Sequence, residues 1–373
     1  MFSSIIWNAS PELINIGSFS LRWYGLLFAL GFLISQQVLY YIYKQESKPI
    51  KDIDTLTIYM VVATIVGARL GHIIFYEPNM LLENPLGVFL PFEFAPEFRF
   101  TGLQGLASHG AAIGILFALW LYSKKKKPGQ NYLQVLDRIV IVVALTGCLI
   151  RLGNFFNSEI IGKPTELPTG VIFTSKISEA LKREDFGANP IASVSIVKNK
   201  NLPEGANGRV PIHIYLFFKE GTSQPIANSF VRSNTKYYLN VLQPYVDEPT
   251  NHDLQYKLYE EKPGLFVAKI DTFGISRHPA QLYESISSLL LFALLFWIWS
   301  REKEKIATGK IFGLFMVVLW TLRFLYEFLK ENQVRFENDL PLNMGQILSI
   351  PLVVVGILVL IWSKRQSSVD RKK

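Results

Sequence analysis

Long runs of apolar residues, separated by short polar loops, dominate the chain. The runs lie at about residues 21–43, 54–76, 108–122, 133–156, 281–300, 310–329 and 345–362. A hydrocarbon core about 30 Å thick is crossed by roughly 20 residues of α-helix, so we predict seven transmembrane helices. The third run is short and contains glycine, but its centre, residues 111–121, carries no charge.

The connection between the fourth and fifth runs, at about residues 157–274, is the longest in the chain. It contains four short stretches rich in β-branched and aromatic residues, with Gly, Pro and Asn between them, which is typical of strands. These stretches are residues 191–197, 210–218, 230–239 and 265–271. We therefore predict a small β-rich head inserted into a helical membrane body.

Basic residues gather in the loops after the first, third and fifth runs and at the C-terminus, whereas the alternate loops carry few of them. The positive-inside rule then places the C-terminus in the cytoplasm and the N-terminus and head outside. The net charge of +8 thus reflects topology, and no motif supports nucleic-acid binding. The lone cysteine, Cys148, lies in an apolar run, which indicates a small buried side chain and excludes a disulfide within the chain.

The predicted fold is an all-α polytopic membrane protein with seven transmembrane helices and an inserted extracytoplasmic β-rich head. Its predicted parts are residues 1–162 (helices one to four), 163–274 (the head) and 275–373 (helices five to seven and the cytoplasmic tail).

Polar residues from all seven helices fall in the outer half of the membrane under this topology. They include Arg22, Tyr24, Arg69, His72, His109, Arg151, Asn154, Gln281, Glu284, Arg323, Glu327 and Gln346. A charged side chain inside a membrane helix costs about 2.5–3.5 kcal/mol on insertion scales, so each one calls for a reason. Snorkelling to lipid headgroups is an equally good explanation for Arg22 or Arg69 taken singly, but it does not explain the shared depth of the whole set.

Two pairs in this set share a helix face. Arg151 and Asn154 are spaced i, i+3, and Arg323 and Glu327 are spaced i, i+4. Arginine binds phosphate through two parallel hydrogen bonds and stays charged in a poorly solvated site. The pattern therefore predicts an outer-leaflet chamber that accommodates a phosphate-bearing lipid.

Seven segments, in order along the chain, resemble the motifs of prolipoprotein diacylglyceryl transferases. They are RWYG at 22–25, GARLG at 67–71, SHG at 108–110, RLGNFFNSE at 151–159 followed by Gly162, RHPAQLYE at 277–284, RFLYEF at 323–328 and MGQILS at 344–349. Two positions depart from the family pattern: Ala280 stands where Ser or Thr is usual, and Leu319 stands where a Tyr is common.

The resemblance implies an enzyme of the bacterial cytoplasmic (inner) membrane that carries out the first step of lipoprotein maturation. Its substrates would be phosphatidylglycerol and the lipobox cysteine thiol that follows a prolipoprotein signal peptide, and its second product glycerol 1-phosphate. No metal-ligand spacing or nucleotide-binding loop occurs in the sequence, so we expect no cofactor and no metal.

The resemblance also implies roles for individual residues. Arg151 and Arg323 would hold the phosphodiester and stabilise the departing phosphate. His109 would act either as the general base for the thiol or as a ligand of the lipid headgroup, and both roles remain open. The residues expected to bind substrate or to orient the arginines are Tyr24, Arg69, Asn154, Asn157, Glu159, Gly162, Arg277, Gln281, Glu284, Glu327 and Gln346.

Two other classes of membrane protein fit the sequence less well. A transporter would show repeated halves and broken helices at mid-membrane, and the sequence shows neither. A structural scaffold would not explain the convergent arginines. An assay of diacylglyceryl transfer to a lipobox peptide separates the three classes.

Overall fold

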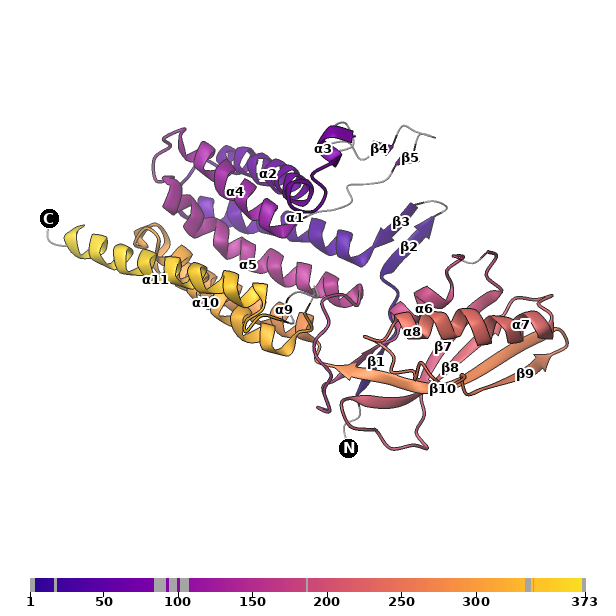
Figure 1. The fold of residues 1–373 in the computed structure, drawn as a ribbon. Coiled ribbons are helices and arrows are strands. Elements are labelled where there is room, and N and C mark those ends of the chain that lie inside the picture. Colours follow the sequence, from indigo (N-terminus) through magenta and orange to yellow (C-terminus); the bar gives the residue numbers. More distant parts are fainter. Residues whose placement is uncertain are drawn as a thin grey trace. The chain divides into compact units, whose positions relative to one another are not determined.

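The computed structural model describes residues 4–16, 19–83, 92–93, 99–100, 107–185, 187–332, 337 and 339–370 (Figure 1). The chain divides into two compact units, each made of several segments. The first unit comprises Met1–Leu30, Gly147–Ser287 and Leu322–Ser349, and the second comprises Gly31–Thr146, Ser288–Thr321 and Ile350–Lys373.

Within the described chain, six helices are long and apolar enough to cross a membrane. They are α1 (Trp23–Gln45), α2 (Lys51–Tyr76), α5 (Tyr132–Phe156), α9 (Ala280–Glu302), α10 (Lys310–Tyr326) and α11 (Met344–Asp370). The seventh predicted run forms the shorter apolar helix α4 (Ser108–Ser123). The chain is therefore a polytopic membrane protein, as predicted.

The second unit is a helical bundle with a continuous apolar core. Buried side chains from α1, α2, α5, α9 and α10, among them Ile42, Leu56, Ile139, Trp299 and Phe315, form this core. Leu319 packs against the same cluster.

Helices α2 and α4 of this unit pack through glycines. A Cβ atom at Gly67 would lie only 2.6 Å from the carbonyl oxygen of Gly110, and one at Gly114 would lie 2.7 Å from the carbonyl oxygen of Ala63. Small residues allow transmembrane helices to approach closely, which offsets the weak drive for apolar helices to associate in lipid.

The first unit contains a mixed sheet with the strand order β1-β6-β10-β8-β7, to which β9 adds by pairing with β10. The strands are β1 (Ile5–Trp7), β6 (Val171–Phe173), β7 (Ile191–Lys198), β8 (Arg209–Phe218), β9 (Tyr256–Lys262) and β10 (Leu265–Arg277). Three of the four predicted strand stretches coincide with β7, β8 and β10. The short strand β1, from near the N-terminus, was not predicted, and it pairs in parallel with β6.

Short helices cover one face of this sheet (Figure 1): α6 (Ser175–Leu181), α7 (Gln224–Phe230) and α8 (Lys236–Val241). Their buried side chains, including Ile177, Leu181 and Leu239, share a core with Ile214 and Leu216 of β8.

The prediction of a strand at residues 230–239 is wrong. The segment continues α7 through a π-helical turn, Val231–Thr235, into α8. Its valine and tyrosines favour strands, but the buried positions Ala227, Phe230, Val231, Tyr238 and Leu239 are spaced as on one helical face. Burial of that face against the sheet outweighs the local strand propensity.

The remaining elements are small. A hairpin of β2 (Glu12–Ile16) and β3 (Phe19–Arg22) precedes α1, α3 (Met80–Glu83) follows α2, and β4 (Phe92–Glu93) pairs with β5 (Arg99–Phe100). A short 3₁₀ turn, η2 (Lys303–Lys305), follows α9, and a second one, η3 (Glu327–Leu329), follows α10.

Candidate functional site

Most of the predicted site residues lie in the first unit, near the ends of helices. Arg151 and Asn154 are in the last two turns of α5, Gln281 and Glu284 are in the first turns of α9, and Arg323 is in the last turn of α10. Tyr24, Asn157, Glu159, Gly162, Arg277, Glu327 and Gln346 belong to the same unit, whereas Arg69 and His109 belong to the second.

Arg151 and Glu284 form a close ion pair between α5 and α9. The Nε atom of Arg151 lies 2.5 Å from Oε2 of Glu284, and the two side chains are 22% and 9% exposed. A charge pair this poorly hydrated holds both side chains in place, because separating them would leave a charge in a low-dielectric site.

Lys330, which sequence reasoning missed, continues this ion pair towards α10. Its side chain is only 2% exposed, and its ammonium group contacts the Oε1 atoms of Glu284 and, at 2.9 Å, Glu327. Glu327 in turn lies 3.9 Å from Nε of Arg323. The result is a chain of alternating charges, Arg151–Glu284–Lys330–Glu327–Arg323, which we call the ion-pair chain.

The second carboxylate oxygen of Glu327 is held by the start of α11. Asn343 donates to it from Nδ2 at 3.1 Å. Asn343 and Gln346 also cap α11 reciprocally: Gln346 N donates to Oδ1 of Asn343 at 2.9 Å, and Asn343 N donates to Oε1 of Gln346 at 3.1 Å. Gln346 thus fixes the helix end that carries the partner of Glu327.

The chain that leaves α5 is held by α9. Gln281 donates from Nε2 to the carbonyl oxygen of Glu159 at 2.5 Å, and Glu159 N donates to the carbonyl oxygen of Asn154 at 3.0 Å. Asn157 is buried and donates to the exposed Glu159 carboxylate at 3.4 Å. Tyr24 packs against Gly153, and its hydroxyl is within electrostatic range of Arg151 and Glu159.

Arg277 is buried and ties three backbone segments together. It donates from Nη1 to the carbonyl oxygen of Gly162 at 2.9 Å and to Oε1 of Glu331 at 2.6 Å, and from Nε to the carbonyl oxygen of Pro244 at 2.5 Å. Gly162 N donates to the carbonyl oxygen of His278 at 3.1 Å. These contacts hold the end of β10 against the segments that follow α5 and α10.

The candidate residues of the second unit lie on α2 and α4. Arg69 is buried, and its Nη2 lies 3.6 Å from the sulfur of Met80. His109, the second residue of α4, is exposed. Its ring centroid lies 4.9 Å from that of Phe75 and 6.1 Å from that of Tyr76.

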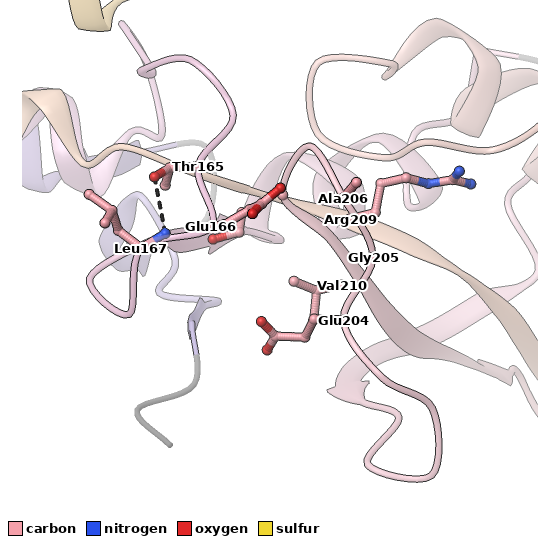
Figure 2. A pocket seen from close by; sticks show the side chains of 10 residues that line it. Thr165, Glu166, Leu167, Glu204, Gly205, Ala206, Arg209 and Val210 are labelled. Carbon is pink, nitrogen blue, oxygen red and sulfur yellow. Dashed lines mark hydrogen bonds between the residues drawn. The ribbon is translucent and has the colours of Figure 1, made fainter.

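A groove of about 360 Å³ opens on the first unit. Figure 2 shows its lining from the segment after α5 (Thr165, Glu166, Leu167), from the loop before β8 (Glu204, Gly205, Ala206) and from the first residue of β8, Arg209. None of the described candidate residues lines it, so we do not assign the chemistry to this groove.

Two further groups escaped the sequence-based prediction besides Lys330. Asn343 precedes α11, and only its spacing of three from Gln346 hints at a capping role. His278 lies in the RHPAQLYE segment, and burial lowers the pKa of its imidazole, so the ring is neutral near pH 7. Its Nδ1 lies 3.4 Å from the hydroxyl of Tyr283.

Comparisons with known proteins confirm the resemblance seen in the seven motifs. The model of a family described as prolipoprotein diacylglyceryl transferase matches residues 11–362. A Bacteroides fragilis protein named phosphatidylglycerol–prolipoprotein diacylglyceryl transferase is 33% identical over 368 residues, which cover 98% of either chain. A relative of the same name from Tolumonas auensis is 31% identical, over 98% of this chain and 99% of its own. Another, from Chloroherpeton thalassium, is also 31% identical, over 99% of this chain and 98% of its own.

Proposed function

The chain belongs to the prolipoprotein diacylglyceryl transferase family, and on that premise we propose that it transfers the diacylglyceryl group of phosphatidylglycerol to the lipobox cysteine of prolipoproteins. A bond forms between the cysteine sulfur and the glycerol carbon that carries the phosphate. The carbon–oxygen bond to that phosphate breaks, and glycerol 1-phosphate leaves with the electron pair. The thiol proton passes to a base, and the product is a thioether.

The observation that carries the proposal is the ion-pair chain, which brings two arginines to one network in the first unit. The side chains of Arg151 and Arg323, the two terminal members of the ion-pair chain, are 22% and 37% exposed, whereas the two glutamates and the lysine between them are 9% exposed or less. A guanidinium can bind a phosphodiester in the ground state and stabilise the extra negative charge that develops as phosphate leaves. Glu284 and Glu327 orient the arginines through their ion pairs.

His109 keeps two proposed roles, general base for the thiol and ligand of the headgroup. A free thiol has a pKa of about 8.5, so thiolate formation near pH 7 needs a base or a positive field. An exposed imidazole can supply the first, and the two arginines can supply the second. Tyr24, Arg69, Asn154, Asn157, Glu159, Gly162, Arg277, Gln281 and Gln346 are proposed to bind the headgroup or to support the groups that do.

The proposed topology has seven spans, with α4 as the short seventh, in the cytoplasmic membrane. The basic loops after α1, α4 and α9 support a cytoplasmic C-terminus and an extracytoplasmic N-terminus. Residues 163–274 form the proposed extracytoplasmic head between two parts of the membrane body, 1–162 and 275–373. The site would then face the outer leaflet, where a signal-peptide cysteine emerges.

Purified enzyme in phosphatidylglycerol vesicles tests the proposed function. Incubation with a lipobox peptide should yield a diacylglyceryl thioether and an equal amount of glycerol 1-phosphate. A peptide with serine in place of the cysteine should give neither product. Release of glycerol 1-phosphate without thioether formation would show a lipase instead of a transferase.

A further inference from the structure

Lys330 is a buried cation in the ion-pair chain and lies outside the seven motif segments. Its backbone pairs with Gly162, which places the side chain between α9 and the end of α10. Taking an ammonium group out of water is costly unless its charge is paired. Two carboxylates, Glu284 and Glu327, provide that pairing.

Each of these carboxylates also has an arginine partner. Glu284 lies 2.5 Å from Arg151, and Glu327 lies 3.9 Å from Arg323. Without the lysine, two carboxylates that are each only 9% exposed would repel each other and could turn away from the arginines. Lys330 therefore sets the position of both guanidinium groups through the glutamates.

The five side chains of the ion-pair chain carry one more positive than negative charge. Three cations and two carboxylates sum to +1, and the sum falls to zero without Lys330. The adjoining pair Arg277–Glu331 is neutral in sum, and the carboxylate of Glu159 is exposed, so water screens it. A phosphodiester carries one negative charge, and a phosphate monoester gains a second with a pKa near 6.

We propose that Lys330 is a positioning residue of the transfer site: it holds Glu284 and Glu327 against the two arginines and supplies the surplus positive charge that the lipid phosphate neutralises. The inference rests on the proposed function. It predicts that the binding of phosphatidylglycerol depends on the net charge of the ion-pair chain.

The first test compares Lys330→Met with Lys163→Met. Lys163 is exposed, and its backbone N–H donates to the carbonyl oxygen of Leu329 at 2.7 Å, so the control removes the same charge from the neighbouring segment. We expect kcat/KM of Lys330→Met to fall about 10- to 100-fold. Residues that orient metal-binding side chains in other enzymes have effects of this size, and Lys330 would orient the arginines in the same indirect way. Most of this loss should appear as a raised KM for phosphatidylglycerol, and Lys163→Met should change by less than about twofold.

The second test restores the charge. In Lys330→Met/Glu327→Gln the network again sums to +1, and the closer pair Arg151–Glu284 is retained. We expect this double variant to recover about fivefold or more in KM relative to Lys330→Met, because the two changes compensate each other. If Lys330 had only a structural role, the additional Glu327→Gln substitution should worsen KM further instead of restoring it.

Activities are expressed per folded enzyme, with the folded fraction measured by size exclusion in detergent. If Lys330→Met does not fold, Lys330→Arg and the charge-restored double variant are compared with the parent, and both should retain measurable transfer. The inference is overturned if Lys330→Met matches Lys163→Met, or if charge restoration gives no recovery. A parent enzyme that makes no thioether would instead overturn the proposed function.

Discussion

At the residue scale, the position of Glu327 depends on the absence of a side chain at residue 345. A Cβ atom there would lie 2.6 Å from Cδ and 2.7 Å from Oε1 of Glu327. Gly345→Ala should therefore displace the carboxylate from Lys330 and lower transfer by about 10- to 100-fold, because small misplacements at a reacting site cost up to about that much.

The matched control for this variant is Gly25→Ala, where an added Cβ would meet nothing within 4 Å. The transfer rates of the two variants, normalised to folded enzyme, are compared, and we expect only Gly345→Ala to lose activity. Equal rates would mean that Glu327 can shift without consequence.

The two proposed roles of His109 differ in their pH dependence. If His109 is the general base, His109→Gln should lose about 10²–10⁴-fold in turnover near pH 7. The loss should shrink as the pH rises towards 9, because more of the peptide thiol ionises unaided. A mutant-to-parent ratio that stays flat from pH 6.5 to 9, at saturating lipid, would assign His109 to headgroup binding.

The sequence allowed the arginines and glutamates of the ion-pair chain to be predicted, but not how they pair. Arg151 shares a helix face with Asn154, yet its ion-pair partner is Glu284 of another helix. Lys330 escaped prediction because nothing local distinguishes it from an exposed lysine at the end of a helix. Its burial arises from the pairing of its backbone with Gly162, which lies far away in the sequence.

At the element scale, Glu46 links three helices of the second unit. It follows α1, accepts from Arg138 of α5 at 2.9 and 3.0 Å, and accepts from Nε1 of Trp299 of α9 at 2.7 Å. Burial alone would raise the pKa of this carboxyl, but the charge of Arg138 and the hydrogen bonds from Arg138, Lys48 and Trp299 outweigh it and lower the pKa below its usual value.

Glu46→Gln should destabilise the bundle by about 3–5 kcal/mol, the usual cost of breaking a buried pair from one side. Because the folded-state pKa is lowered, the stabilisation is fully present above the unfolded pKa of about 4.3 and disappears as the pH falls through the lower folded value. Melting temperatures of parent and variant in detergent should therefore differ at pH 7 and converge only below about pH 4. A difference that already vanishes between pH 7 and 5 would contradict this account.

Whether a segment forms a helix or a strand could be predicted where one feature of the sequence dominates. It could not be predicted where strand propensity and helical spacing conflict. Long apolar runs predicted the membrane helices, although α11 continues beyond its predicted end at residue 362 to Asp370. At residues 230–239, strand propensity and helical spacing of the buried positions conflict, and only packing on the sheet decides for the helix. Strand β1 has just three residues, and its pairing with β6 leaves no trace in the local sequence.

At the scale of the whole molecule, the proposed topology places Lys126 and Asn207 on opposite sides of the membrane. Single cysteines at these positions, in a background where Cys148 is replaced by serine, should react with a membrane-impermeant maleimide from opposite sides of sealed vesicles. Labelling of both cysteines from the same side would contradict the proposed topology and, with it, the outer-leaflet location of the site.

The central claim is that an arginine network binds a lipid phosphate and promotes its departure. The most direct measurement is the transfer rate of Arg151→Lys and Arg151→Ala, at saturating peptide and increasing phosphatidylglycerol, beside Arg209→Lys and Arg209→Ala as controls. Arg209, the first residue of β8, forms an exposed ion pair with Asp247 at 2.8 Å. We predict that both Arg151 variants fold and lose at least about 10²-fold in kcat/KM, because an ammonium cannot reproduce bidentate phosphate contact. Near-parental transfer by Arg151→Ala, with a normal response to phosphatidylglycerol, would contradict the account.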